Sequence, residues 1–226
     1  MDHEEGRPCR TESEAAIIKL KYRLLVWLAM AALSGGAMAQ GEDARRLAAG
    51  LAVMSGDVRL LAGKGETLHR REGLRARVTG DLSSLPLLLR RAGGEAAAVP
   101  PLRAALAKKD WRTLERELAA LRRRYPLDLR TLLPATPSPE QLRLGAAIHR
   151  ERCAGCHDAS NVEAKLPALN LFEQRRKMPR EEFAARLIIG VRGNGSTAYG
   201  NPFSDLELGA LISYYGSAKT LSHNTP

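Results

Sequence analysis

The sequence predicts an all-α protein made of a bundle-like helical module followed by a small helical domain. Apolar residues recur at helical rather than alternating spacing along nearly the whole chain, which favours amphipathic helices over strands. Aromatic residues make up 4% of the 226 residues, whereas leucine, alanine and arginine abound. Pro134, Pro137 and Pro139 predict a stiff linker, and the domain boundary is expected near residue 136.

Residues 1–39 have the layout of a secretory signal peptide. A positive region at residues 19–23 precedes an apolar run at residues 24–33, and an A-x-A cleavage site ends at Ala39. The apolar run is shorter than the roughly 20 residues that a membrane-spanning helix needs. We therefore expect an exported mature chain that starts at Gln40. Anchoring to the membrane by an uncleaved signal is the alternative.

Residues 40–136 are expected to form three or four helices that bury a small core. Apolar stripes predict a short helix over residues 41–54 and longer helices over residues 66–91 and 100–124. Asp110 can cap a break in the last of these, which would divide it into a hairpin of two helices. We identify no motif typical of catalysis or metal binding in this module, so its role stays open.

The basic charge of the chain is concentrated in the same module. Residues 40–136 contain 19 Lys and Arg against 11 Asp and Glu, whereas residues 137–226 contain 11 against 9. Such a surface can attract an acidic partner protein or anionic lipid headgroups. A solvated arginine-rich face is the simpler alternative. Nucleic acid is not an expected partner of an exported protein.

Cys153, Cys156 and His157 form a C-x-x-C-H motif at the end of a predicted helix. Ser138 and Gln141 have the spacing of a capping box that begins this helix. Two thiols followed at once by an imidazole are the arrangement that attaches a c-type haem. Thioether bonds from both cysteines to the haem vinyl groups would hold the porphyrin, and the His157 imidazole would ligate the iron.

Redox dithiols and zinc sites also contain C-x-x-C and are the alternatives. A structural zinc needs four ligands, and after residue 40 the chain has no other cysteine and only His69, His149 and His223 besides the motif. A thioredoxin-like dithiol needs a βαβ context, which the helical pattern lacks. The favoured cofactor is therefore one covalently attached haem c per chain. Because bacteria attach haem outside the cytoplasm, the signal peptide agrees with this interpretation and predicts a periplasmic protein.

Residues 138–218 resemble the single-haem class I cytochromes c. The resemblance implies a middle helix over residues 179–190 and a last helix that packs across the first. It also implies that a proline-containing loop lines the histidine side of the haem, and the loop at residues 166–169, with Pro167, fits this place. A carbonyl of that loop would bind the second ring nitrogen of His157 and orient the ligand. Pro167 is thus a predicted cofactor-binding residue.

The sequence departs from this family at the sixth iron ligand. The family usually places a methionine, often as Met-Pro, between the last two helices, but residues 194–203 contain no methionine. Met178 precedes Pro179 and the middle helix, which makes it a candidate ligand. Tyr199, an asparagine of the loop and an open position are the alternatives. The identity of this ligand would set the haem potential and the access of small molecules to the iron.

These features predict an electron carrier that transfers single electrons between redox partners, with a periplasmic location and an acidic or membrane-associated partner. The missing loop methionine leaves a second hypothesis, a haem protein that binds or senses a small ligand at an open distal side. An enzyme of the peroxidase kind is not expected, because the chain has one C-x-x-C-H motif and no obvious distal histidine. Electron donor, acceptor and oligomeric state are not predicted.

Overall fold

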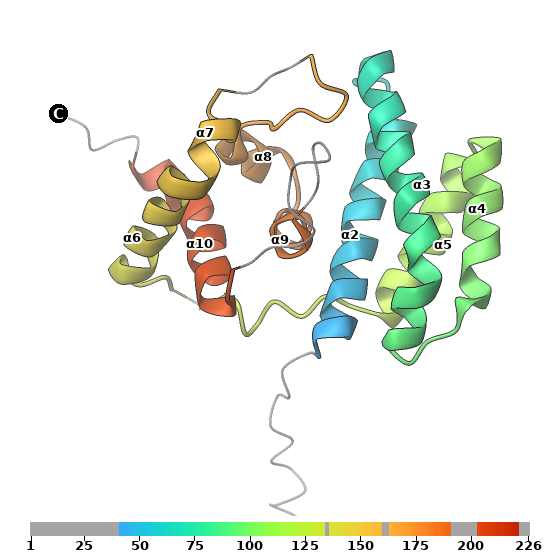
Figure 1. Ribbon diagram of the computed structural model, residues 1–226, viewed down its shortest axis with the longest axis horizontal. Coiled ribbons are helices and arrows are strands. Elements are labelled where there is room, and N and C mark those ends of the chain that lie inside the picture. The colour runs from blue at the N-terminus through green and yellow to red at the C-terminus, as the bar shows by residue number, and fades with distance from the viewer. Residues whose placement is uncertain (1–40, 134–135, 160–162, 191–202, 222–226) are drawn as a thin grey trace, which may run out of the picture. The chain divides into compact units, whose positions relative to one another are not determined.

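Every regular element in the described part of the chain is a helix, which confirms the all-α prediction. The computed structural model describes residues 41–133, 136–159, 163–190 and 203–221 (Figure 1), with side chains to residue 217. Residues 40–226 form one compact unit. The predicted signal peptide and its cleavage site lie outside the described residues, as does the centre of the linker at residues 134–135. Among the helices described, none is long and apolar enough to cross a membrane.

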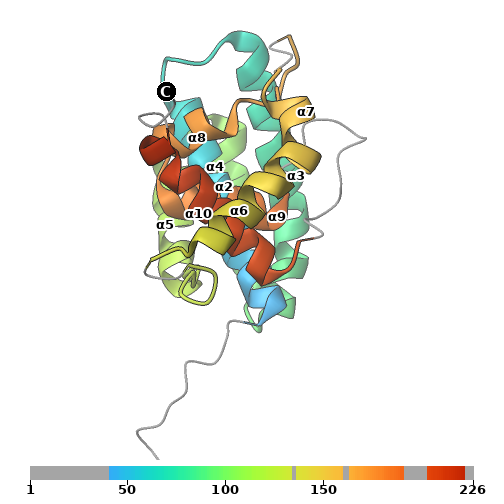
Figure 2. The ribbon, with the colours of Figure 1, turned by 90° about the vertical axis from the view of Figure 1, so that its left-hand side faces the viewer.

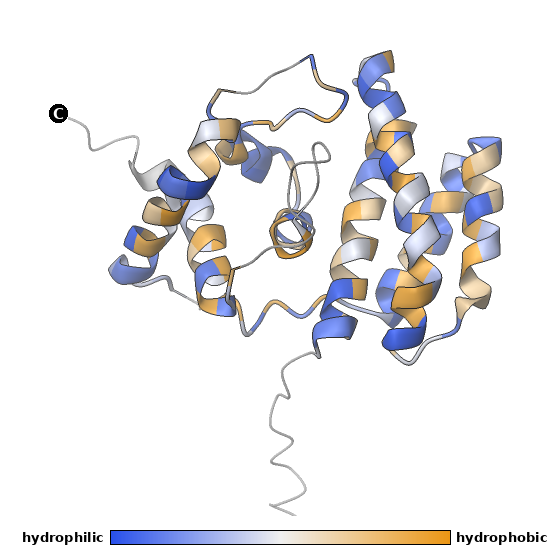
Figure 3. Cartoon of the chain, in the orientation of Figure 1, coloured by the Kyte–Doolittle hydropathy of each residue, from blue (hydrophilic) through white to orange (hydrophobic). Residues whose placement is uncertain are grey.

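The N-terminal helices are α2 (Glu42–Ala62), α3 (Leu68–Arg91), α4 (Val99–Lys108) and α5 (Trp111–Arg124), with a short 3-10 turn at Ala96–Ala98 before α4. Apolar and polar residues lie on different sides of these helices (Figure 3), as the sequence pattern predicts. The apolar sides meet in one core of buried aliphatic side chains, which includes Leu47, Leu51, Met54, Leu61, Leu74, Val78, Leu82, Leu85, Leu89, Leu102, Leu114 and Leu118.

Helix α2 is longer than the sequence predicts. The predicted helix ends at residue 54 because glycines follow, but α2 continues through Gly56 to Ala62. Gly56 lies where α9 approaches, and a side chain there would overlap the Glu182 carboxylate, with Oε2 only 2.8 Å from the Cβ position. The glycine therefore permits a close helix contact, and burial of the residues beside it outweighs its weak helix propensity.

Helix α3 stays continuous through Pro86 because another helix replaces a lost hydrogen bond. Proline has no N–H, so the carbonyl of Leu82, four residues earlier, loses its intrahelical donor. The Arg103 guanidinium of α4 donates to this carbonyl, with an Nη2–O distance of 3.0 Å. This contact also fixes Arg103 against α3.

The predicted break at Asp110 is confirmed. The Asp110 carboxylate accepts a hydrogen bond from the Thr113 backbone N–H at 3.1 Å and begins α5. Before it, Lys109 ends α4 in the left-handed conformation, with φ 56°. Left-handed backbone turns the chain sharply at the end of a helix, so α4 and α5 form the expected hairpin.

The C-terminal helices are α6 (Pro139–Ile148), a π-helical turn (His149–Cys153), α7 (Ala154–His157), α8 (Leu171–Lys177), α9 (Arg180–Ile189) and α10 (Asp205–Leu221). Ser138 and Gln141 form the predicted capping box of α6. Helices α6 and α10 lie side by side in both views (Figures 1 and 2). At their crossing Gly145 allows contact, because a Cβ there would meet the Ala210 carbonyl oxygen and lie 2.6 Å from the Tyr214 Cβ.

The two sets of helices share an interface between α2 and α9. Ala49, Ala52 and Val53 of α2 pack against Ala185 of α9, and these small side chains let the helices approach closely. Ion pairs also join the two parts of the chain away from this interface. Arg122 contacts Glu181 at 2.8 Å, and Arg45 contacts Asp205 at 2.8 Å.

Candidate haem attachment site

The C-x-x-C-H motif lies at the end of a continuous helical segment formed by α6, the π-helical turn and α7. Cys153 closes the π-helical turn, and Cys156 and His157 belong to α7. Turns of π-helix are rare and occur mostly as single turns, frequently at functional sites. The Cys153 side chain is half-buried, Cys156 is exposed, and neither forms a disulfide.

The imidazole of His157 is oriented by the predicted loop. Its Nδ1 lies 2.7 Å from the Leu169 carbonyl oxygen. Because a carbonyl can only accept a hydrogen bond, Nδ1 must carry the proton, and the neutral ring then has its lone pair on Nε2. A histidine in this tautomer can ligate a metal through Nε2.

Pro167 does not supply that carbonyl. Its own carbonyl oxygen accepts a hydrogen bond from the Leu169 backbone N–H at 3.0 Å, which closes a three-residue γ-turn. The carbonyl of Leu169, the last residue of this turn, contacts His157 instead. The sequence indicates the loop through its proline, but the hydrogen-bonding pattern inside the loop selects the acceptor.

A buried polar group lies beside Cys153, and the sequence interpretation does not anticipate it. The Tyr215 hydroxyl of α10 lies 2.9 Å from Nδ1 of His149 and also contacts the Cys153 thiol. Nε2 of His149 lies 3.4 Å from the Asp158 carboxylate. His149 and Tyr215 are 6% and 3% exposed, so their polar atoms are satisfied by one another rather than by bulk water.

Burial changes the proton affinity of this group. Desolvation raises the pKa of the Cys153 thiol, although the hydrogen bond from Tyr215 opposes this effect. Desolvation also raises the pKa of Tyr215, and the neighbouring Cys153 adds to the increase. Both groups are therefore neutral at physiological pH, and the cluster holds the thiol as S–H.

Aromatic rings enclose His149. Phe172 of α8 meets the ring edge to face with centroids 5.2 Å apart, and Tyr214 and Tyr215 lie at 5.9 and 5.5 Å. Phe183 of α9 contacts Tyr215 at 5.5 Å and extends the cluster. Aromatic pairs at these distances stabilise a core beyond the area that they bury. The cluster holds α8, α9 and α10 around the helical segment that carries the motif.

Met178 lies in the apolar cluster built around Ile148, Phe183, Leu211 and Tyr215. It follows α8 in extended conformation, and its side chain is half-buried. The loop at residues 191–202, which includes Tyr199, lies outside the described residues. Among the residues that are described, no group of three or more His, Cys, Asp and Glu side chains is placed to hold a metal ion.

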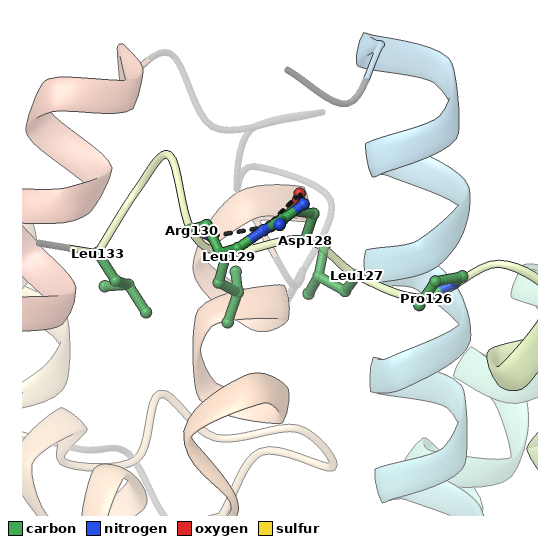
Figure 4. Close-up of a pocket in the computed structure, with 6 residues that line it drawn as sticks. All are labelled: Pro126, Leu127, Asp128, Leu129, Arg130 and Leu133. Atoms are coloured by element: carbon green, nitrogen blue, oxygen red, sulfur yellow. Dashed lines mark hydrogen bonds and ion pairs between the residues drawn. The ribbon is translucent and has the colours of Figure 1, made fainter. Parts of the chain in front are cut away.

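A pocket of about 490 Å³ lies in the segment that joins α5 to α6 (Figure 4). The six residues that line it all come from this one segment: Pro126, Leu127, Asp128, Leu129, Arg130 and Leu133. Its two charged residues pair with each other at 2.7 Å, and hydrogen bonds from Arg130 lower the pKa of Asp128 to about 2. The pocket includes no residue of the C-x-x-C-H motif.

Comparison of the chain with protein-family models, with curated proteins and with solved structures finds no match.

Proposed function

We propose that this chain is an exported c-type cytochrome with one covalently attached haem, which transfers single electrons between redox partners. The main observation is the hydrogen bond between Nδ1 of His157 and the Leu169 carbonyl oxygen, at 2.7 Å. A histidine of the C-x-x-C-H motif that is already oriented by a backbone carbonyl has the tautomer required of an axial ligand. A redox dithiol or a surface histidine does not need this contact.

The residues around the motif fit the cofactor. Cys153 and Cys156 carry thiols that are not in a disulfide and are separated by less than one helical turn. Arg175 of α8 has a buried Nε without a hydrogen-bond partner among the described residues, and desolvation lowers its pKa. A haem propionate is an anionic partner suited to such a guanidinium. When bound, the haem supplies the Fe(II)/Fe(III) couple, whose potential depends on its axial ligands and on burial.

The experiment is expression of the full chain in bacteria together with the haem-attachment machinery, followed by mass spectrometry of the exported product. We expect a mass increase of one haem that survives denaturation. The change Cys153→Ser with Cys156→Ser should abolish it. Cys9→Ser is the matched control, because Cys9 precedes the expected cleavage site and should not affect attachment. Wild-type protein that is exported without covalent haem would overturn the proposal.

Optical spectra of the loaded protein then separate electron transfer from ligand sensing. The long-wavelength ferric band of methionine ligation, with no response to carbon monoxide, would indicate a closed six-coordinate carrier. Met178→Ala should remove this band if Met178 is the ligand. A high-spin spectrum with ready carbon monoxide binding would instead favour the ligand-binding function. The basic N-terminal helices would provide the docking surface, and they would bind an acidic redox partner or an anionic membrane.

A further inference from the structure

A pocket of about 400 Å³ lies between α3 and α4, and all its lining residues belong to the N-terminal helices. Its volume is within the range of small-molecule sites. Three cations line it: Arg75 of α3, Arg103 of α4 and Lys109 at the end of α4. No aspartate or glutamate lines the pocket with them. A concave site with one sign of charge concentrates ions of the opposite sign.

These three cations form no ion pair with the residues that the structure describes, whereas arginines elsewhere in the chain do. Glu72 is the acidic residue that acts on Arg75 electrostatically, but its carboxylate is bound to Lys165 at 3.0 Å. The Nε atom of Arg75 is buried and has no hydrogen-bond partner among the described residues. A buried donor without an acceptor is uncommon in a folded protein.

The backbone fixes the Arg103 guanidinium, and it places Lys109 at the end of α4. Arg103 is fixed by its hydrogen bond to the Leu82 carbonyl, which is available because Pro86 has no N–H. Lys109 occupies a left-handed position, where glycine or asparagine is the usual residue at a helix end. A lysine at this position adds a cation to the pocket lining, which glycine or asparagine would not supply.

The other lining residues are apolar side chains, or their hydroxyl groups already donate hydrogen bonds to the backbone. Leu82 and Leu106 line the pocket but are only 1% and 9% exposed, and Ala107 beside them is exposed and apolar. The Thr79 hydroxyl donates to the Arg75 carbonyl and the Ser83 hydroxyl donates to the Thr79 carbonyl, each at 2.9 Å. The cations are therefore the groups that can bind a ligand, and they bind anions.

We propose that this pocket binds an amphipathic phosphate, with the phosphate group on Arg75, Arg103 and Lys109 and the alkyl part against Leu106 and Ala107. Guanidinium groups match the oxygens of a phosphate in geometry as well as in charge. A phospholipid headgroup and a free organic phosphate share this chemistry. The site is independent of the haem and would give the N-terminal helices a ligand of their own.

The test is calorimetric titration of the full mature chain with hexyl phosphate and, separately, with inorganic phosphate. We expect hexyl phosphate to bind with a dissociation constant of about 1 mM or tighter, and inorganic phosphate to bind more weakly because it lacks the alkyl part. Arg75→Gln and Lys109→Asn should each weaken binding about tenfold. Asparagine tolerates the left-handed conformation, so the second variant removes the charge without straining the turn.

Lys64→Asn is the matched control, because it removes one exposed cation outside the pocket. Ala107→Leu fills the pocket from an exposed helical position without changing charge, and should also abolish binding. Absence of hexyl phosphate binding, or equal weakening by Lys64→Asn, would overturn the proposal. Binding to vesicles of phosphatidylcholine with phosphatidylglycerol distinguishes the two sources of the phosphate group. If the chain binds these vesicles and Lys109→Asn removes the binding, the ligand is a lipid headgroup. If the chain does not bind the vesicles, the ligand is a soluble phosphate.

Discussion

The Arg186 guanidinium of α9 donates a hydrogen bond to the Asp57 carboxylate of α2, with an Nη2–Oδ1 distance of 2.7 Å. Arg77 of α3 contacts the same carboxylate, at 2.6 Å from its Nη2. Arg186 also binds Glu182 of its own helix at 2.8 Å, and Glu182 accepts from Arg59 at 2.7 Å. Asp57 is 0% exposed, so a buried charge network joins the N-terminal helices to α9.

Asp57→Asn should destabilise the protein by about 3–5 kcal/mol, because it leaves the guanidinium groups of Arg77 and Arg186 without their full counter-charge in a buried site. The free energy of unfolding from urea titration measures this loss. Glu117→Gln is the control, since the pair of Glu117 with Arg116 is exposed and should contribute at most about 1 kcal/mol. Equal losses in the two variants would contradict the buried network.

Stability should fall in acid, and Asp57 should account for part of the decrease. Burial alone would raise the pKa of Asp57, but the charges and hydrogen bonds of Arg77 and Arg186 outweigh it, so the pKa lies below the ordinary value of 3.8. A carboxyl group whose pKa is lower in the folded state than in the unfolded state stabilises the fold at pH values above its unfolded pKa. This stabilisation is lost as the pH falls through the folded pKa. Urea titrations from about pH 5 down to about pH 2 should therefore show a shallower pH dependence for Asp57→Asn than for the wild type. Parallel profiles would count against this assignment.

Two glycines of α2 should respond in opposite directions to the same substitution. Gly56→Ala places a methyl group against the Glu182 carboxylate and should cost about 1–3 kcal/mol through overpacking. Gly50→Ala has no heavy atom within 4 Å of the new Cβ and should stabilise α2 by up to about 1 kcal/mol. Thermal unfolding of both variants measures the difference. A stabilising Gly56→Ala would mean that α2 and α9 are further apart than the structure has them.

Tyr215→Phe should destabilise the protein by about 1–3 kcal/mol, because it removes the hydroxyl that contacts His149 and Cys153 in a buried site. Tyr214→Phe is the matched control: its ring belongs to the same aromatic cluster, but its side chain is only half-buried. We expect a change within about 0.5 kcal/mol for the control in the same denaturant titration. Similar losses at both positions would indicate that the Tyr215 hydroxyl has no particular role.

Local signals in the sequence predict the parts of the fold that depend on neighbouring residues. Asp110 caps α5 and Ser138 begins α6 because each side chain bonds a backbone N–H three residues later. The last turns of α2 are instead stabilised by tertiary contacts, because Val58 and Leu61 are buried in the core and Gly56 lies against Glu182 of α9. No periodicity or motif indicates that contact, so the sequence predicts a helix that ends too early.

The same distinction applies to the candidate site. The spacing of Cys153, Cys156 and His157 is itself a motif, and a proline indicates the loop that reaches the histidine. His149 has no such signal, because its partner Tyr215 is 66 residues away. Its role beside Cys153 follows from the crossing of α6 and α10, and only the three-dimensional structure shows that crossing.

The network around Asp57 also constrains the order in which the chain can fold. Asp57 is 20 residues from Arg77 but 129 residues from Arg186, so α2 is synthesised long before its second cationic partner exists. A buried carboxylate with only part of its counter-charge is unfavourable, and contacts so distant in the sequence form slowly. Without α9, the N-terminal helices would leave Asp57 with Arg77 as its counter-charge and without the second guanidinium of Arg186. The complete packing of α2 therefore depends on a helix that is encoded in the other half of the chain.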